Sequence, residues 1–399
     1  MDGNEPENSK DNGPENGPGV RRATSEAPHV EGAVAEILSG IGPAPVAFLL
    51  LFCSPSYDLA GVAAGLSRAV PGATIAGCTT AGEITPRGYR TGTVTAVAFS
   101  ADRFTVTARL IEPMSRFRFE DGQALVHAMR EEHAAARGAR KGRTFALLIS
   151  DGLSMSEEIL VSILGDAFAE IPLIGGSAGD DLMFRETHVL LGGETRKDAA
   201  IVSLVSTDLP FQTFQTQHFV SSSEKLVVTR ADPARRLVAE INAEPAAAEY
   251  ARLIGLRAGD LTPAVFAAHP LVVRAAGRDY VRSIQRVHDD GSLSFFCAID
   301  EGIVMTVAAS IDLIANLSDT FDDLKRGVGP IEAVLGFDCV FRYLEMEQRQ
   351  ILGPVQNLMV ENRVTGFSTY GEQFGMMHVN QTFTGIAFGT GGGTGVRHG

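Results

Sequence analysis

Tryptophan is absent from the 399 residues, and cysteine occurs only four times. The four cysteines are widely spaced and form no C-x-x-C pair, so the sequence predicts neither a zinc site nor a disulfide framework. Each lies in or beside an apolar run, where a reduced, buried thiol is expected. The nine histidines form no H-E-x-x-H or H-x-H pattern, which argues against a zinc site made from protein ligands alone.

Positive charge is also scarce. Lysine and arginine number 34 against 48 acidic residues, for a net charge of −14. Nucleic acid is therefore disfavoured as a partner, because binding to phosphates needs a clustered basic surface. Apolar runs such as 43–53 are too short to cross a membrane, and the acidic N-terminus has no apolar stretch typical of a signal peptide. We expect a soluble cytoplasmic protein without membrane insertion.

Short apolar runs alternate with amphipathic helix patterns along most of the chain. Val46–Phe52 and Phe145–Ile149 are continuously apolar, as expected for strands covered on both faces. Each is followed by a helix pattern, a second short strand and a glycine-rich loop. The sequence therefore predicts an α/β fold with two mixed-sheet domains, at 29–210 and 211–392, built from related strand-helix-strand-loop-strand units.

Other segments carry local signals of their own. Residues 1–28 have almost no apolar side chains and cannot repay the entropy of ordering, so a disordered tail is predicted there, and a flexible tail at 393–399. Asp232-Pro-Ala predicts a helix that runs to about Ile241, since Asp is a favoured N-cap and Pro a favoured first residue. One further helix is expected over about 345–359.

A repeated motif links the two halves of the chain. Gly77–Glu83 and Gly366–Glu372 share the pattern G-x-[ST]-T-x-G-E, and the longer segments 77–100 and 366–389 are identical at eight of 24 positions. An internal duplication is the simplest explanation. The same offset of 289 extends backwards to pair Phe48 with Phe337 and Phe52 with Phe341.

The two repeated loops are candidate ligand sites. Their glycines permit close backbone approach, and their hydroxyls and amides can hold an anion or a polar ligand. The structural alternative is that Ser and Thr complete the turns while Glu caps a neighbouring backbone. A phosphate-binding lysine motif is lacking in the sequence, so a nucleotide site is not expected. The candidate ligand-binding residues, with Arg342 as the partner of a carboxylate, are Thr79, Thr80, Glu83, Arg342, Ser368, Thr369 and Glu372.

Cys78 raises the hypothesis of a thiol enzyme. It could sit at a strand-to-loop turn, with Glu83 or a distant histidine as its activator. No nucleophile elbow or Cys–His signature accompanies it in the sequence. Phe367 occupies the aligned position in the later motif, which indicates that the slot accepts an apolar side chain. A buried structural thiol is the favoured interpretation.

A haem site needs less than a zinc site, because one axial imidazole and an apolar pocket suffice. His378 lies in a glycine-bearing loop between strands and among apolar side chains, which suits an axial ligand. A single histidine in such a run is more often structural. The candidate haem-binding residues are His378, Met376, Met377, Tyr370 and Phe374, with His188 and His218 as less favoured iron ligands.

Four motifs together resemble the FIST sensory proteins, which carry an N-terminal and a C-terminal FIST domain. These motifs are Gly77–Glu83, Gly175–Asp180, Phe337–Arg342 and Tyr370–Glu372. The resemblance implies an intracellular sensor of small ligands and not an enzyme. A narrower resemblance is to NosP, the FIST haemoproteins that sense nitric oxide, and it is carried by Val228–Asp232, Glu240–Asn242, Phe295–Gly302 and Met377–Gly385.

The narrower resemblance implies haem b (iron protoporphyrin IX) with His378 as metal ligand, nitric oxide as signal, and a separate histidine kinase or cyclic-di-GMP enzyme as partner. Nitric oxide would then weaken the iron–histidine bond and shift the loop that carries His378. Three alternatives stay open: a haem-free FIST sensor of an amino acid or other small metabolite, the Cys78 thiol enzyme, and a purely structural partner-binding protein. The related loops predict domains that face each other with ligand between them, and a homo-oligomer is compatible with the sequence.

Overall fold

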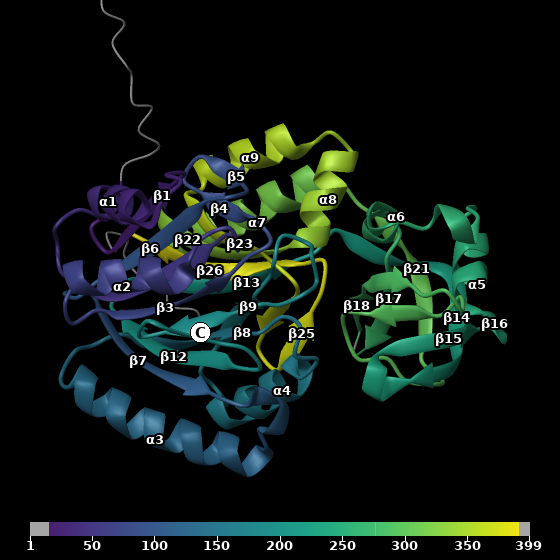
Figure 1. Ribbon diagram of the computed structural model, residues 1–399, viewed down its shortest axis with the longest axis horizontal. Coiled ribbons are helices and arrows are strands. Elements are labelled where there is room, and N and C mark those ends of the chain that lie inside the picture. The colour runs from purple at the N-terminus through teal and green to yellow at the C-terminus, as the bar shows by residue number, and fades with distance from the viewer. Residues whose placement is uncertain (1–15, 276, 391–399) are drawn as a thin grey trace, which may run out of the picture.

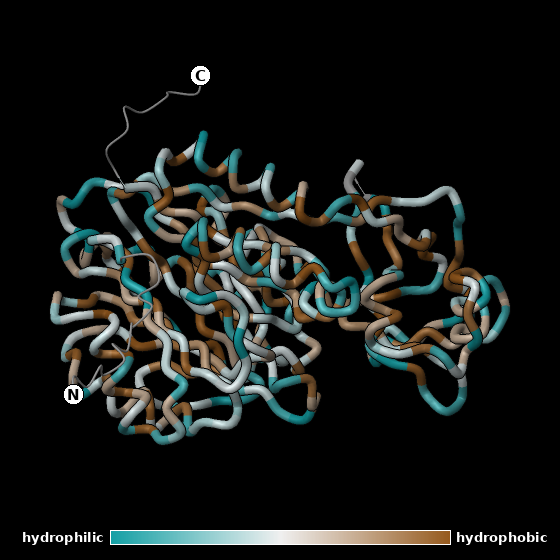
Figure 2. Tube along the Cα trace, turned by 90° about the horizontal axis from the view of Figure 1, so that it is seen from above, coloured by the Kyte–Doolittle hydropathy of each residue, from teal (hydrophilic) through white to brown (hydrophobic). Residues whose placement is uncertain are grey.

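The computed structural model describes residues 16–275 and 277–390. It confirms the mixed α/β class, and Figure 1 shows a large body beside a smaller domain. We call residues 219–310 the inserted domain, because the chain leaves the body after β13 (Phe211–Thr216) and returns to it at α7 (Leu313–Val328). Seen from above in Figure 2, this domain stands at one end of the body, with hydrophilic loops at its outer edge.

The body consists of three units with the same order of elements: strand, helix, strand, helix, strand, hairpin, strand. The first unit contains β1 (Val20–Ser25), α1 (Val30–Ile41), β2 (Val46–Cys53), α2 (Leu59–Ala69), β3 (Thr74–Thr79), β4 (Glu83–Thr85), β5 (Gly88–Arg90) and β6 (Val94–Ser100). The second contains β7 (Phe104–Ile111), α3 (Phe119–Arg137), β8 (Arg143–Ser150), α4 (Glu157–Phe168), β9 (Leu173–Ser177), β10 (Val189–Leu191), β11 (Glu194–Arg196) and β12 (Ala200–Thr207).

The third unit differs from the others in two respects. The inserted domain separates its first strand from its first helix, and two helices replace the second helix. After β13 and α7 it contains β22 (Ile331–Cys339), α8 (Val340–Gln348), α9 (Leu352–Glu361), β23 (Val364–Thr369), β24 (Glu372–Phe374), β25 (Met377–Val379) and β26 (Phe383–Gly389).

Each unit forms one six-stranded sheet that is completed by a hairpin from another unit. The first sheet, β1-β6-β2-β3, ends in the second unit's hairpin β10-β11. The second sheet, β7-β12-β8-β9, ends in the third unit's hairpin β24-β25, and the third, β13-β26-β22-β23, ends in the first unit's hairpin β4-β5. The exchange is cyclic, so the body has pseudo-threefold symmetry, and hairpins cross the limit predicted at 210/211.

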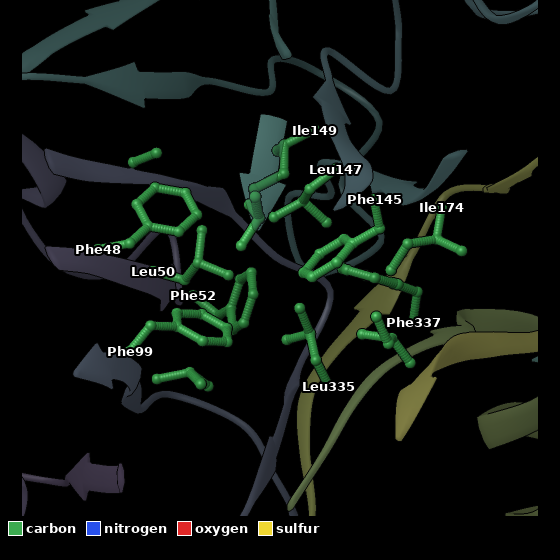
Figure 3. Close-up of a cluster of buried hydrophobic side chains, with 14 of the residues drawn as sticks. Phe48, Leu50, Phe52, Phe99, Phe145, Leu147, Ile149, Ile174, Leu335 and Phe337 are labelled. Carbon is green, nitrogen blue, oxygen red and sulfur yellow. The ribbon is translucent and has the colours of Figure 1, made fainter. Parts of the chain in front are cut away.

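The inner faces of the three sheets share one hydrophobic core. Alternate residues of β2, such as Phe48 and Phe52, point into this core, while Leu49 and Leu51 point outward to α1 and α2. Figure 3 shows Phe52, Phe145 and other side chains from the three sheets converging there. On the outer faces, α3 and α4 cover the second sheet, and α7 and α9 the third. Burial on both faces explains why the central strands are continuously apolar.

A glycine is required where the two parallel strands of each sheet approach. Gly77, Gly175 and Gly366 occupy equivalent positions in β3, β9 and β23. A Cβ on any of them would overlap a carbonyl oxygen of the neighbouring strand, so no side chain fits. These oxygens belong to Leu51, Leu148 and Gly336, at 2.1, 1.8 and 1.7 Å from such a Cβ.

The inserted domain is an eight-stranded curved sheet with two helices. The strands at its two edges, β18 (Arg278–Arg282) and β19 (Ile284–Val287), are separated in the chain by Ser283 alone, so the sheet curls back on itself. The other elements are β14 (Phe219–Asp232), β15 (Leu237–Ile241), β16 (Glu244–Pro245), α5 (Ala246–Leu253), α6 (Pro263–Ala268), β17 (Leu271–Ala275), β20 (Leu293–Phe295) and β21 (Val304–Ser310).

Part of the predicted N-terminal tail is a strand, so that prediction is wrong for β1. This strand pairs antiparallel with β6. The amides of Gly19 and Val20 donate to Glu332 of the third unit, at 2.6 and 2.8 Å. Main-chain pairing and a distant acceptor stabilise the segment, and composition reveals neither of them. Residues 1–15 and the predicted tail at 393–399 lie outside the described residues.

The helix predicted over 232–241 is also wrong. Asp232-Pro-Ala starts only a short 3-10 turn, Pro233–Arg235, which Arg236 ends with a left-handed φ of 50°. Leu237–Ile241 forms β15 and pairs with β14 and β20. Pairing with two neighbouring strands outweighs the local start signal.

The single helix predicted over 345–359 is two helices, α8 and α9, with Gln350 between them in the left-handed region (φ 57°). This extra length changes the internal repeat. Phe52 pairs with Cys78 and Phe337 with Phe367, so Phe52 is equivalent to Phe337. The backward pairings of Phe48 with Phe337 and of Phe52 with Phe341 were four residues out of register.

Candidate functional site

The glycine-rich loops that follow β3, β9 and β23 meet at one end of the body. Their backbones form hydrogen bonds with one another in a cycle, so the three units are joined at their loops as well as through their hairpins. The bonds run from Ser368 N to Gly82 O (2.8 Å), Ala81 N to Ser368 O (3.1 Å), Ser177 N to Gly371 O (2.8 Å), Tyr370 N to Ser177 O (3.1 Å) and Gly179 N to Thr79 O (3.0 Å).

The shared glutamate of the repeated motif closes its own loop. One carboxyl oxygen of Glu83 accepts from the Thr80 hydroxyl, and the other accepts from the amide and hydroxyl of Thr93, at 3.1 and 2.7 Å. Glu372 makes the equivalent bonds with Thr369 and Thr382. The motif thus conserves a loop-closing contact in both copies.

Burial controls the charge of these two carboxyls. Both side chains are completely buried, and desolvation raises the pKa of Glu83 to about 7 and that of Glu372 to about 8. The hydrogen bonds from threonine act in the opposite direction but are outweighed. Near neutral pH the loops therefore hold protonated or partly protonated carboxyls inside the protein.

The remaining residues of the predicted ligand set are also engaged within the protein. Thr79 Oγ1 accepts from the His188 amide at 3.0 Å. Arg342, fully buried, donates from Nε to Asp338 at 2.6 Å and from Nη1 to Nδ1 of His218 at 2.9 Å. Its charge is balanced by Asp338 inside the body, and its Nη2 atom is buried without a partner among the described residues.

Cys78 lies in the core of the body. Its side chain is fully buried, and desolvation raises the pKa of the thiol well above its usual range. A thiol in that state is not a nucleophile near neutral pH. The geometry supports the structural interpretation of this cysteine.

We call the contact region between the body and the inserted domain, around Tyr370, the seam. The Tyr370 ring stacks on Phe184, with 4.8 Å between centroids, and lies 6.3 Å from Phe296 of the inserted domain. Its hydroxyl donates to Asp180 and accepts from the Leu182 amide at 2.9 Å. Loops of the second and third units and the inserted domain therefore share one aromatic cluster.

Ion pairs cross the seam beside this cluster. Arg236 of the inserted domain donates to Glu157, at the start of α4, at 3.0 Å, and both side chains are buried. Arg282 lies 3.8 Å from Glu158, which also accepts from the Ala298 amide at 2.6 Å. Two arginines of the inserted domain are thus paired with two glutamates of the body.

His378 occupies the hairpin strand β25 on the body side of the seam, opposite Gln373 of β24. It is only 4% exposed, and Nδ1 has no hydrogen-bond partner among the described residues. Desolvation, with the nearby charges of Arg236 and Arg282, lowers its pKa to about 3. The imidazole is therefore uncharged near neutral pH.

The residues predicted around a haem lie in different surroundings in this arrangement. Met376 is half exposed and lies against Gly165 of α4, whereas Phe374 packs on the core of the body. Tyr370 is committed to the aromatic cluster, and Met377 lies at the edge strand β25. Of these five residues, His378 is the one that supplies an imidazole. Across 16–275 and 277–390, no group of three His, Cys, Asp or Glu residues is placed to hold a metal ion.

The seam contains residues that the sequence did not mark as site candidates. Arg236 lies in the segment predicted as a helix, and Arg282, Glu157 and Glu158 carried no predicted role. Asn380 and Gln381 belonged to a quoted motif, but no role was assigned to them. What identifies Asn380 and Gln381 as site candidates is that they carry buried polar atoms without partners among the described residues, and not a sequence pattern.

The fold and the seam define a class: a two-part α/β protein whose buried polar groups lie between a rigid body and a domain attached by two chain crossings. The chain matches the FIST N domain over residues 47–244 and the FIST C domain over residues 246–375. It belongs to the FIST domain family, whose members are sensory and signalling proteins. The two matches meet inside the inserted domain, and β25 and β26 lie beyond them.

One relative is an uncharacterized protein of Methanocaldococcus jannaschii, which is 24% identical over 272 residues. The similarity covers 58% of this chain and 51% of the relative, so the chain spans about half the length of that protein. None of the helices in the described residues is long and apolar enough to span a membrane.

Proposed function

We propose that this protein senses a small ligand that binds at the seam and changes how the inserted domain sits on the body. The carrying observation is the set of polar atoms on His378, Asn380 and Gln381 that are buried there without partners in the described part of the chain. Buried polar groups are costly when unpaired, at about 1–3 kcal/mol each. A ligand that supplies their partners gains this free energy.

The connections of the inserted domain provide a mechanism for signalling. We call residues 217–218 and 311–312 the hinge. The Ile311 amide donates to the His218 carbonyl at 2.8 Å, so the two crossings are bonded to each other. The buried His218 ring accepts from Arg342 and donates to Glu345 at 2.7 Å. Rotation about this anchored hinge would change the seam, where Phe296 of the inserted domain packs beside Tyr370 and Phe341 of the body.

Ligand binding shifts such an equilibrium only through different contacts in the two arrangements. The seam offers these contacts, because its walls come from both parts of the protein. Hydrogen–deuterium exchange of β18 and β25 tests the proposal. A ligand that binds at the seam is expected to change amide protection in both strands, while β2 and β8 in the core stay unchanged. Equal exchange with and without bound ligand would refute the moving domain.

Haem b, with nitric oxide as the signal, is the second candidate. It is favoured by the buried, uncharged imidazole of His378 with its unpartnered Nδ1, since neutral imidazole is the form that ligates iron. Haem, when bound, would supply the iron that takes up nitric oxide, and His378 would hold it. Because Tyr370 and Phe374 are packed against other side chains, this candidate requires the inserted domain to move away from β25.

Absorption spectra of haem-reconstituted protein, ferric, ferrous and ferrous with nitric oxide, test this candidate. A sharp Soret band at stoichiometric haem that moves on nitric oxide addition supports it. The variant His378→Ala is expected to lose that band, with His188→Ala as the matched control that keeps it. A variant lacking His378 that binds haem with an unchanged spectrum would refute the assignment.

The output is proposed to be a separate histidine kinase or cyclic-di-GMP enzyme, which reads the position of the inserted domain. The FIST N and FIST C domains are sensory and signalling domains, which supports a separate protein as the recipient of the signal. Kinase autophosphorylation measured with wild-type protein and with a hinge variant, His218→Gln, tests this step. If ligand changes kinase autophosphorylation equally with the wild type and with His218→Gln, the hinge is not part of the signal to the kinase.

A further inference from the structure

Each of the three units has a turn before its last strand, and the turn of the third unit differs from the other two. Each copy has a left-handed residue two positions before the strand: Gly92 (φ 69°), Asp198 (φ 45°) and Gln381 (φ 51°). In the first unit Thr91 and Gly92 are exposed, whereas in the third unit Asn380 and Gln381 are each only 1% exposed. The inserted domain covers this one copy.

The side-chain amides of Asn380 and Gln381 are not needed to form the turn in the third unit. Glycine and threonine form the same turn in the first unit, where the shared threonine bond to glutamate is also present. Both side-chain atoms of Asn380 and the Oε1 atom of Gln381 lack partners in the part of the chain that the structure describes. Gln381 Nε2 reaches only the Phe266 and Ala267 carbonyls of α6, at 3.4 and 3.5 Å.

His378 and Asn380 face the same point of the body. A Cβ on Gly371 would lie 2.5 Å from His378 Nε2 and 3.2 Å from Asn380 Nδ2, so glycine is the residue that leaves room for both side chains. Gly371 directly follows Tyr370, whose ring belongs to the aromatic cluster with Phe184 and Phe296. The unpaired Asn380 amide therefore lies near the backbone that carries one ring of the aromatic cluster.

The charged groups at the seam already have partners. Arg236 is paired with Glu157, and Arg282 lies near Glu158. The Asp180 carboxyl accepts from the Tyr370 hydroxyl and three backbone amides, and His378 is neutral. A ligand with a net charge would lose its hydration without gaining a free counter-charge, which is unfavourable in a buried site. An uncharged ligand meets no such penalty. The surroundings favour a neutral polar molecule over a carboxylate or a phosphate.

We propose that Asn380 and Gln381 bind a small, flat, uncharged ligand that carries a hydrogen-bond donor beside an acceptor, as in a heterocyclic carboxamide or lactam. A free side-chain amide pairs with such an edge through two hydrogen bonds, one from each of its atoms. Rings of the aromatic cluster supply a stacking surface. This inference rests on the proposed function, because the inserted domain has to open for the ligand to enter.

Titration of the full chain with nicotinamide and with nicotinate, followed by ligand-observed NMR and calorimetry, tests the ligand class. The two probes share one ring and differ in a neutral amide against a carboxylate. Saturable binding of nicotinamide is expected at millimolar concentration, with nicotinate at least about 10-fold weaker. Equal or tighter binding of nicotinate, or no binding of nicotinamide, would overturn the inference.

Two variants place the probe at the proposed residues. Asn380→Thr and Gln381→Gly introduce the residues that the first unit carries in the same turn, so both are compatible with its backbone. Each is expected to weaken nicotinamide binding by about 10-fold or more, with Thr91→Ala as the matched control that leaves binding unchanged. If Asn380→Thr fails to fold, Asn380→Asp keeps the shape and is expected to lose binding too. Unchanged affinity in these variants would overturn the assignment.

The two proposals fail in different ways. Nicotinamide that binds through Asn380 without altering exchange in β18 and β25 would support the ligand site and refute the moving domain. The protein could instead fail to bind nicotinamide, while haem or another ligand changes the hydrogen–deuterium exchange of β18 and β25. That result would support the proposed sensor and refute this ligand class. Exchange and binding are therefore measured on the same samples.

Discussion

Replacement of Glu372 by glutamine should change how the stability of the protein depends on pH. In the native state desolvation keeps the pKa of this carboxyl at about 8, whereas in the unfolded chain it ionises near its ordinary value of 4.5. Between these values the native state binds one more proton than the unfolded state. The free energy of unfolding therefore falls as the pH rises through this range.

The expected magnitude follows from that proton. Each pH unit costs the wild type about 1.4 kcal/mol relative to a variant that does not titrate. Glutamine has almost the same shape, is neutral at every pH, and can still bond Thr369 and Thr382. Glu372→Gln should therefore match the wild type near pH 5 and gain on the order of 4 kcal/mol on it by pH 8.

Urea unfolding at pH 5, 6, 7 and 8 measures this difference. Glu83→Gln is the matched variant, and its gain should end about one pH unit earlier, because the pKa of Glu83 is raised only to about 7. Relative to Glu372→Gln, the variant Glu372→Ala should lose about 2–4 kcal/mol at every pH, since two threonines lose a buried acceptor. Parallel pH curves for the wild type and Glu372→Gln would mean that the native carboxyl is ionised, and would refute the reasoning.

Three further predictions concern packing, charge and reactivity. Gly366→Ala should lower the free energy of unfolding by at least about 3 kcal/mol or prevent folding, because its Cβ would lie 1.7 Å from the Gly336 oxygen. The matched control is Gly353→Ala on α9, which has open space around it. Its free energy of unfolding, measured by thermal unfolding, should stay within about 1 kcal/mol of the wild type. Arg236→Ala should lower the free energy of unfolding in urea by about 3–5 kcal/mol, since it leaves Glu157 buried and unpaired. A loss below about 0.5 kcal/mol would show that this ion pair does not stabilise the seam. Cys78 should resist iodoacetamide at neutral pH until the protein unfolds, and rapid labelling of native protein, read by mass spectrometry, would revive the thiol-enzyme hypothesis.

The sequence was sufficient for the class of fold and for most of its elements. Continuously apolar runs such as Val46–Phe52 predict strands covered on both faces, and β2 and β8 are such strands. Glycines after these strands predict close backbone approach, and Gly77 and Gly366 lie against carbonyl oxygens. These features depend on local chemistry, which neighbouring residues in the chain express directly.

The sequence also pointed to the region of the seam through the motif that contains Tyr370 and His378. It indicated that Gly77–Glu83 and Gly366–Glu372 are copies of one loop. Whether their polar groups serve a ligand or the loop itself was left open. Bonds of Glu83 to Thr93, and of Glu372 to Thr382, favour the loop, because each threonine follows shortly after the hairpin that its glutamate begins.

Only the tertiary structure decided which units complete one another and what covers the third copy of the turn. The hairpins are exchanged in a cycle among the three units. Each sheet is therefore completed by residues that lie about one hundred or more positions from its other strands in the chain. No periodicity in the sequence indicates such pairing. β1 and β15 are strands for the same reason, since distant partners supply their hydrogen bonds. The burial of Asn380 and Gln381 likewise depends on where the inserted domain lies. Burial, pairing and charge balance are properties of the folded surroundings, whereas the sequence by itself determines the continuously apolar strands such as β2 and β8, the tight glycines and the repeated loop.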